Sequence, residues 1–247
     1  MPPIFPRLVK KGFDISFTYH ADAILREDFK EATKELDKVI SSIQIPISEL
    51  VLGGGGEAKN TQRLRISLYA IGWQKVNFRL EKKINDDVTF SQSHEVDHVK
   101  YFSSGTIALE IEWNNKDPFF DRDLENFNRL HSDGAISIGG IITRGKSLQT
   151  GLEGALTKFA DDHEFDSIDD IQKFGLEPTK RQKNNINRVL SKGSNYSFSE
   201  VWAHAFFSDK FGTATTHWEK LFSRLERGVG SPCPIFAIGI PLACINT

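Results

Sequence analysis

Three acidic residues of the sequence are spaced so that they can converge on one site. Glu110 and Glu112 lie two apart in an apolar segment, residues 109–113, that is predicted to be a strand, so both carboxylates point to one face. Asp97 precedes Glu110 by thirteen residues, across a predicted turn, and can approach from a neighbouring strand. Carboxylates that converge need protons, cationic partners or a bound metal, and they suit a hard cation such as Mg²⁺. Such a site predicts hydrolysis of a phosphodiester bond.

The same residues allow other interpretations. From the spacing of Glu110 and Glu112 alone, the solvated face of an edge strand is the favoured interpretation, because the pattern E-x-E is common. Asp117, Asp121 and Asp123 raise the alternative of a second metal site. Their position before a helix suits N-capping, and N-capping is the role that we predict for Asp121.

A second motif suggests a different chemistry. Residues 140–147 match the phosphate-loop pattern G-x-x-x-x-G-K-[ST], with Lys146 as the lysine. The loop of such a motif needs left-handed conformations, which β-branched residues resist, and residues 141–143 are Ile-Ile-Thr. We therefore interpret this segment as a strand with its exit turn. A P-loop ATPase that uses Gly140 to Ser147 is kept as an alternative function.

Hydrophobic periodicity predicts the elements that position these residues. The densest part of the pattern is a strand, a helix and a second strand in succession, which form a crossover unit and favour parallel neighbouring strands. The fold class is therefore α/β, and residues 1–247 are interpreted as a single domain. The main predicted elements are an amphipathic helix over residues 22–43, a helix over 60–70, strands over 76–80 and 107–113, a helix over 121–131, and buried strands over 135–143 and 234–240.

The composition narrows the class of protein further. The chain has 247 residues, of which 39% are hydrophobic, and this content excludes an intrinsically disordered chain. It carries neither a long apolar run nor the features of a signal peptide, so we expect a cytoplasmic protein with no membrane partner. Cys233 and Cys244 lack the spacing of a zinc site. The net charge of −2 argues by itself against a dedicated nucleic-acid binder, although the charge is unevenly distributed along the chain.

The residues around the acidic cluster resemble the core motif of PD-(D/E)XK nucleases. The segment Asp97-His98-Val99-Lys100, followed by residues 107–113, is most similar to that of the BglII/BstYI group of type II restriction endonucleases, and BamHI is more distantly similar. The resemblance implies a PD-(D/E)XK restriction-endonuclease-like core, a central mixed sheet flanked by helices. It continues into residues 19–25, 121–130, 135–143 and 234–240, and it is thin over 150–212, a candidate inserted or DNA-embracing subregion.

This resemblance implies an endonuclease that needs Mg²⁺ and hydrolyses both strands of double-stranded DNA at a short palindromic site, without a nucleotide cofactor. It also implies a homodimer and a cognate DNA methyltransferase in the same system. The implied catalytic residues are Asp97, Glu110 and Glu112, and the implied metal-binding residues are Asp97, Glu110 and Ile111.

Position 112 departs from the usual pattern. Glu112 stands where many members carry Lys and BglII-like enzymes carry Gln, and it is similar to BamHI in this respect. An ionised carboxylate cannot donate a hydrogen bond to the scissile phosphate as Lys does. We therefore expect Glu112 to hold metal or to orient the attacking water, which leaves open whether one metal or two take part.

Polar and basic residues near the acidic strand and near the C-terminus are candidates for DNA binding, because Lys and Arg neutralise phosphates. A helix that packs its apolar face inward while its basic face stays solvated is the alternative for the second group. Basic residues also gather over 179–192. A catalytically idle DNA-binding domain, which binds DNA without cutting, is thus a third candidate function. The candidate DNA-binding residues are Asn114, Asn115, Lys116, Thr215, His217, Lys220 and Arg224.

Overall fold

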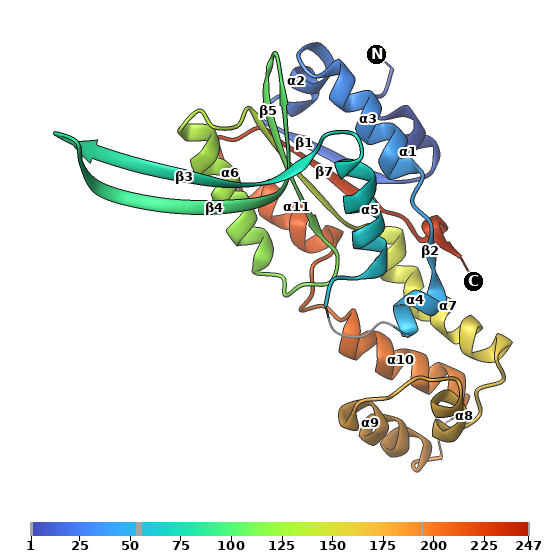
Figure 1. Ribbon diagram of the computed structural model, residues 1–247. Coiled ribbons are helices and arrows are strands. Elements are labelled where there is room, and N and C mark those ends of the chain that lie inside the picture. The colour runs from blue at the N-terminus through green and yellow to red at the C-terminus, as the bar shows by residue number, and fades with distance from the viewer. Residues whose placement is uncertain (1, 53–55, 194, 247) are drawn as a thin grey trace.

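The computed structural model describes residues 2–52, 56–193 and 195–246. Its centre is a mixed six-stranded sheet in the order β1-β7-β6-β5-β4-β3 (Figure 1). Strands β5, β6 and β7 are parallel, whereas β4, β3 and β1 are antiparallel to their neighbours. The sheet strands are β1 (Asp14–Thr18), β3 (Gln74–Ile84), β4 (Asp87–Phe102), β5 (Gly105–Glu112), β6 (Ile138–Arg144) and β7 (Ile235–Ile240), and β2 (Ile45–Pro46) pairs separately with β8 (Ile245–Asn246).

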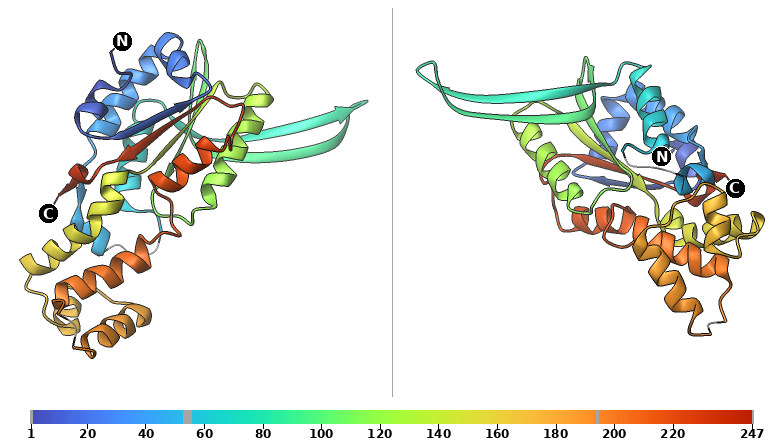
Figure 2. Two further views of the ribbon diagram at one scale, coloured as in Figure 1. Left: turned by 180° about the vertical axis from the view of Figure 1, so that it is seen from behind. Right: turned by 60° about the horizontal axis from the view of Figure 1, so that its bottom comes forward.

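Helices cover both faces of this sheet (Figures 1 and 2). On one face α6 and α11 pack with Ala108, Ile141 and Ala237, and on the other face α3, α5 and α7 belong to the cluster that contains Leu109 and Ile142. The helices are α1 (Pro6–Lys10), α2 (Ala21–Glu27), α3 (Lys30–Ser41), α4 (Ile47–Val51), α5 (Lys59–Tyr69), α6 (Phe119–Ser132), α7 (Lys146–Asp162), α8 (Ile168–Lys173), α9 (Lys180–Leu190), α10 (Phe198–Lys210) and α11 (Trp218–Glu226), with a 3₁₀ turn η1 (Leu242–Cys244).

The predicted crossover unit is confirmed: β5, α6 and β6 follow one another, and β5 and β6 pair in parallel. Every residue of β6 and β7 is buried, as the continuous apolar runs in the sequence indicate. Gly140 is required at the centre of β6 because a Cβ atom there would lie 2.2 Å from the ring of Phe236. The α/β class and the central mixed sheet flanked by helices are therefore confirmed.

The prediction of one helix over residues 22–43 is wrong, because the segment forms two helices, α2 and α3, with a break at Asp28 and Phe29. Phe29 leaves the helical region, with φ −124° and ψ 41°, and its buried ring packs edge-on against Phe102 at a centroid distance of 5.6 Å. The Thr33 hydroxyl donates to the carbonyl of Leu25, which Phe29 N–H would reach in a continuous helix. Tertiary packing of one aromatic side chain thus overrides the local periodicity.

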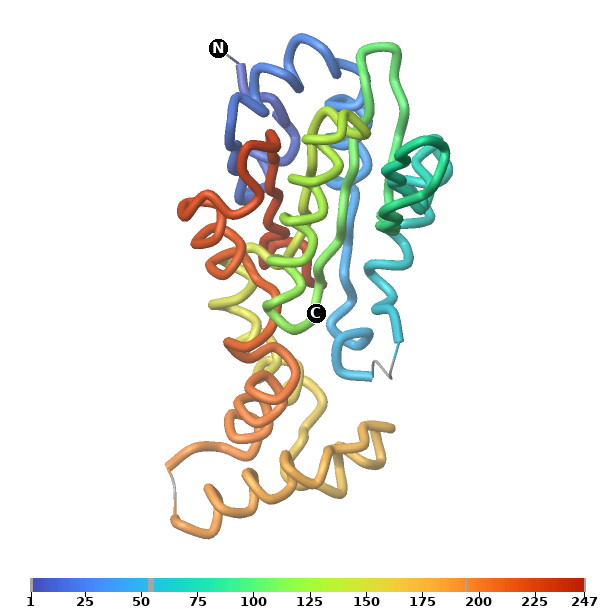
Figure 3. Tube along the Cα trace, turned by 90° about the vertical axis from the view of Figure 1, so that its left-hand side faces the viewer, coloured from blue at the N-terminus to red at the C-terminus, as the bar shows by residue number. Residues whose placement is uncertain are grey.

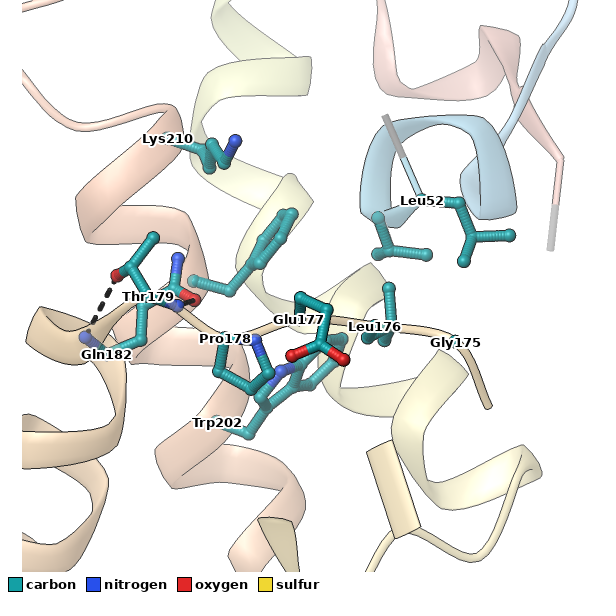
Figure 4. A pocket seen from close by; sticks show the side chains of 11 residues that line it. Leu52, Gly175, Leu176, Glu177, Pro178, Thr179, Gln182, Trp202 and Lys210 are labelled. Carbon is teal, nitrogen blue, oxygen red and sulfur yellow. Dashed lines mark hydrogen bonds between the residues drawn. The ribbon is translucent and has the colours of Figure 1, made fainter. Parts of the chain in front are cut away.

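Residues 150–212 form a helical extension made of most of α7 with α8, α9 and α10 (Figures 1 and 3). Phe165 lies at its centre, with its ring edge-on to those of Phe174 and Trp202 at 5.3 and 5.8 Å. These rings belong to the same apolar cluster as the sheet residues Leu109 and Ile142. The loop before α9 borders a pocket that also touches α4, and the Thr179 and Gln182 side chains cap α9 beside it (Figure 4). Whether this extension embraces DNA stays a prediction.

Strands β3 and β4 continue past the rest of the sheet as a long two-stranded hairpin (Figure 1). The predicted strand over residues 76–80 is the base of this hairpin, and the alternation of half-buried and exposed residues that identifies it ends at Leu80. In the chain that the structure describes, no helix is long and apolar enough to span a bilayer.

Candidate active site

Asp97 on β4 and Glu110 on β5 face each other across an antiparallel strand pair. The register His98 with Leu109 brings Asp97 beside Glu110, and the backbone N–H of Asp97 lies 3.4 Å from Glu110 Oε1. β4 and β5 are joined by a tight turn after the pair Phe102 and Gly105, so the residues between the two acids simply lengthen both strands. The structure therefore brings together the two acids that the sequence places thirteen residues apart.

An irregularity in β4 shapes the surroundings of Asp97. Gln74 and Val76 of β3 pair with Val99 and Val96, so β4 contains one more residue than β3 over this stretch. Such bulges re-aim side chains and are common beside active sites. Tyr69 of α5 donates from its hydroxyl to the Asp97 carbonyl at 3.1 Å, which fixes this main chain from the adjacent helix.

Glu112 shares the face of Glu110 at the end of β5. The two side chains are 3% and 7% exposed, respectively, which excludes the solvated edge strand. Asn115 Nδ2 donates to Glu112 Oε2 at 2.6 Å, and Arg122 Nη2 on α6 lies 3.4 Å from Oε1. Ile111 points to the opposite face, where it packs against the main core, so its main chain alone borders the carboxylates.

The same face receives a third buried carboxylate, Asp123 of α6, which the sequence suggested only as part of an alternative second metal site with Asp117 and Asp121. Asp123 is 2% exposed and its Oδ1 lies 2.7 Å from Arg122 Nη2, the atom that also contacts Glu112. The available signal was its place in α6, three residues after Phe120 and one before Leu124, both fully buried. An acid on the apolar face of an amphipathic helix is a feature that needs a reason.

Burial and mutual repulsion raise the pKa of these carboxyl groups. Burial is the main cause for Glu110, followed by the charges of Asp123, Asp97 and Glu112. Burial and the nearby Asp123 likewise raise the pKa of Glu112, while its hydrogen bond from Asn115 opposes the change. Asp97 is half exposed and pairs with Lys75 Nζ at 3.2 Å. The cluster therefore lacks sufficient positive charge of its own when ionised.

The residues present fit a hard divalent cation by their chemistry. Asp123 Oδ2 is buried and receives no hydrogen bond from any group that the structure describes. Across residues 2–52, 56–193 and 195–246, no three acid, His or Cys side chains are arranged so that they alone could hold a metal ion. Mg²⁺ is typically held by one or two carboxylates together with waters and substrate phosphates, so such an open arrangement suits it.

The two predicted DNA-binding segments lie side by side. Lys116 and Thr215 form an antiparallel bridge, and Asn115 and Thr216 exchange hydrogen bonds, from Asn115 N to Thr216 Oγ1 and from Thr216 N to Asn115 O. Because Asn115 also holds Glu112, this loop pair is connected directly to the carboxylates. The sequence placed these segments about a hundred residues apart and gave no sign of their pairing.

Arg144, at the end of β6, contacts both of these loops, the one after β5 and the one before α11. Its side chain is fully buried and donates to the carbonyls of Trp113 and Thr216 at 2.9 and 2.8 Å and to Gln149 Oε1 at 2.7 Å. Among the described residues no carboxylate pairs with it, and burial lowers its pKa to about 9. Arg144 is therefore a clamp on two loops, a role with no local sequence signal.

Other candidate DNA-binding residues are engaged within the protein. Arg224 forms two 2.8 Å contacts with Asp121, and Lys220 Nζ lies 3.6 Å from Asp117. The N-capping prediction for Asp121 is wrong, because α6 begins at Phe119 with Pro118 as its N-cap, so Asp121 lies within the first turn. The ring nitrogens of His217 are buried without hydrogen-bond partners among the described residues. Contacts of these residues with DNA stay predictions.

The phosphate-loop pattern does not form a phosphate-binding loop. Strand β6 runs straight through to Arg144, and Gly145 alone separates it from α7. The first N–H of α7, that of Lys146, already donates to Asp14 Oδ2 at 2.7 Å. The interpretation of this segment as a strand with its exit turn is confirmed, and the P-loop alternative is excluded at this site.

The fold and the site together define a nuclease of the restriction-endonuclease type: a mixed sheet carries the acids on adjacent strands, and paired polar loops flank them. The family model for restriction endonuclease BglII/BglIII matches residues 13–240, and the chain belongs to this family. Among curated proteins, none matches the sequence. The protein is accordingly a type II restriction endonuclease, a site-specific deoxyribonuclease that acts on double-stranded DNA.

Proposed function

We propose that this endonuclease cleaves both strands of a short palindromic DNA site in a reaction that requires Mg²⁺, with Asp97, Glu110 and Glu112 as its catalytic residues. The observation that carries the proposal is the direct juxtaposition of Asp97 and Glu110 across β4 and β5, with Glu112 on the same face. This arrangement supports a PD-(D/E)XK centre in which Glu replaces the usual Lys, as in BamHI. A homodimer, a cognate methyltransferase and a cytoplasmic location belong to the same proposal.

Asp97, Glu110 and the main chain of Ile111 would hold the cation, since Asp97 is half exposed and faces Glu110 across the strand pair, and Ile111 follows Glu110 in β5. When bound, Mg²⁺ neutralises charge that develops on the scissile phosphate. Glu112 is held by Asn115 and is biased towards taking up a proton, because burial raises its pKa. A cation bound beside it would favour its ionised form, in which it can orient the attacking water or accept its proton. Asn114, Asn115 and Lys116 border this point and would position the DNA backbone.

The test is cleavage of DNA of known sequence in Mg²⁺ and in EDTA, with the ends mapped by sequencing. We expect discrete, symmetric cuts in Mg²⁺ alone, and a loss of at least about 100-fold in rate for Asp97→Asn, Glu110→Gln and Glu112→Gln. Glu125→Gln is the matched control, because Glu125 is an exposed acid of α6 whose ion pair in the described part of the chain is with Arg129 on the surface. Cleavage by Glu110→Gln at the wild-type rate would contradict the proposed centre.

The homodimer is tested separately by sedimentation of the full chain with and without DNA that contains the mapped site. Two chains for each DNA duplex are expected, because a palindromic site presents the same sequence to each of two identical subunits. One chain on each duplex would contradict the dimer without affecting the assignment of the catalytic residues.

A further inference from the structure

Asp123 occupies a position at which the amphipathic pattern of α6 calls for an apolar side chain. Its neighbours on this face, Phe120, Leu124 and Phe127, are fully buried in the cluster between α6 and the sheet. A carboxylate in such a place is costly unless its charge is met by a partner. The position therefore needs a compensating interaction that an apolar residue would not need.

Arg122 meets only part of this need. Its Nε and Nη2 lie 2.8 and 2.7 Å from Asp123 Oδ1, but Oδ2 is buried and receives no hydrogen bond within the described part of the chain. The guanidinium itself is half exposed and stacks on Phe119 at 4.3 Å from the ring centroid. A half-exposed arginine does not require a fully buried partner, so pairing with Arg122 does not explain why Asp123 is where it is.

The Asp123 side chain belongs to the carboxylate cluster, since it shares Arg122 with Glu112 and its charge acts on Glu110. Arg122 Nη2 bridges the two acids of one side, at 2.7 Å from Asp123 Oδ1 and 3.4 Å from Glu112 Oε1. On the other side of the cluster, Asp97 and Glu110 form the pair joined across β4 and β5. Four acids thus meet as two pairs, one between strands and one between β5 and α6.

We propose that Asp123 is a further cation-binding residue of this centre, which contributes Oδ2 beside Glu112 to the divalent cation. The inference rests on the proposed function and deepens it, because it adds a ligand from α6 to those supplied by the two strands. Arg122 supplies positive charge to the pair Glu112 and Asp123 when no cation is bound. A hard cation with oxygen ligands is the partner that satisfies the buried atom Oδ2.

The test is a titration of the purified full-length protein with Mn²⁺, with free Mn²⁺ measured by electron paramagnetic resonance. We expect Asp123→Asn to weaken Mn²⁺ binding roughly 10- to 100-fold, as loss of a residue at a metal site does. Glu125→Gln, on the exposed side of the same helix, should bind as the wild type does. Arg122→Gln should bind Mn²⁺ at least as tightly as the wild type, because it removes a competing charge.

A role limited to holding Arg122 predicts the opposite pattern, in which Asp123→Asn leaves Mn²⁺ affinity unchanged, and this result would overturn the inference. Far-ultraviolet circular dichroism in EDTA checks that each variant is folded, and Asp123→Ala replaces the Asn variant if it is not. If Glu110→Gln loses Mn²⁺ and Asp123→Asn keeps it, the inference is wrong and the proposed function stands. If the wild-type chain binds no Mn²⁺ and cuts DNA in EDTA, the proposed function fails as well.

Discussion

Arg224 of α11 and Asp121 of α6 form a two-pronged ion pair, in which Nε and Nη2 of the guanidinium each lie 2.8 Å from a carboxylate oxygen. The pair joins the two helices that cover one face of the sheet. Asp117 adds a second carboxylate at 3.6 Å from Arg224, and it also approaches Lys220 at 3.6 Å. The loop that follows β5 is thereby connected to α11 through charged contacts as well as through the main chain.

This pair predicts a loss of stability when Asp121 is changed. Asp121→Asn should lower the free energy of unfolding by about 1 kcal/mol, a modest value because Asp121 is half exposed and solvent screens the pair. Arg224 lowers the pKa of Asp121 through its hydrogen bonds. The contribution is therefore full above the ordinary aspartate pKa of about 3.9 and is lost as pH falls through the lowered pKa. Urea unfolding of both proteins between pH 7 and pH 3 measures the difference, and a constant gap at every pH would refute this explanation.

We predict that Glu110, a proposed catalytic residue, lowers the stability of the folded protein when it is ionised. Its pKa is raised, first by burial, so its ionised form costs stability once the pH exceeds the ordinary glutamate pKa of about 4.3. In EDTA, Glu110→Gln should therefore be more stable than the wild type by about 1–3 kcal/mol at pH 8, with a smaller difference at pH 5. Thermal unfolding measures this, and Mg²⁺ should narrow the gap because it stabilises only a chain that binds it. If the stability difference between Glu110→Gln and the wild type were the same at pH 5 and pH 8, a buried ionised Glu110 would not be its cause.

Arg144 predicts a coupling between the two polar loops. Arg144→Lys retains a charge but loses the fork that reaches Trp113, Thr216 and Gln149, so buried acceptors are left without donors. We expect a loss of about 3 kcal/mol in the free energy of unfolding. DNA binding, measured in the Glu110→Gln background that is expected to be inactive, should weaken because the two loops lose their register. Thr215→Val, which removes one of the contacts to Arg144, is the milder comparison. Unchanged DNA affinity in a folded Arg144→Lys protein would disprove the coupling.

We predict that Lys146 is not needed for DNA cleavage, which distinguishes a nuclease from an enzyme that hydrolyses nucleotides. Its side chain is exposed and lies 3.8 Å from Glu219, and its N–H is already bonded to Asp14. Lys146→Ala should therefore cut DNA at the wild-type rate, and added ATP should change neither protein. Equilibrium dialysis with labelled ATP provides the complementary measurement, in which no retention is expected. Loss of cutting by this variant, or cutting stimulated by ATP, would contradict the reading of residues 140–147 as strand and turn.

The central strands, α6 and the acidic pair were predictable because their signals are local. The alternation over residues 107–113 and the continuous apolar run over 135–143 each reflect the burial of one short segment. Such burial is visible in the hydrophobic pattern of that segment alone. The proximity of Asp97 to Glu110 was also predictable, since a hairpin with a tight turn relates positions along the chain by simple counting.

The remaining features depend on contacts between distant parts of the chain. Arg144 meets Thr216, 72 residues away, and Arg224 meets Asp121, 103 residues away, so neither partner can be inferred from a local pattern. The break at Phe29 has the same origin, because the ring is fixed by Phe102 on a strand of the sheet. Asp123 is an intermediate case: its place on a buried helix face is visible in the sequence, whereas the carboxylates that it meets are not.

The distribution of positive charge predicts which surface meets DNA. Lys116 is exposed in the loop pair beside Glu112, whereas Lys180 and Arg181 lie on α9, at the far end of the helical extension (Figure 1). Each Lys that contacts a phosphate adds about one to the slope of log affinity against log salt concentration. We expect Lys116→Ala to reduce this slope by about one, and Lys180→Ala or Arg181→Ala to leave it unchanged. The measurement is DNA binding at several salt concentrations in the Glu110→Gln background. A reduced slope for the α9 variants would instead show that the helical extension reaches along the DNA, because only a charge close to a phosphate releases its counterion.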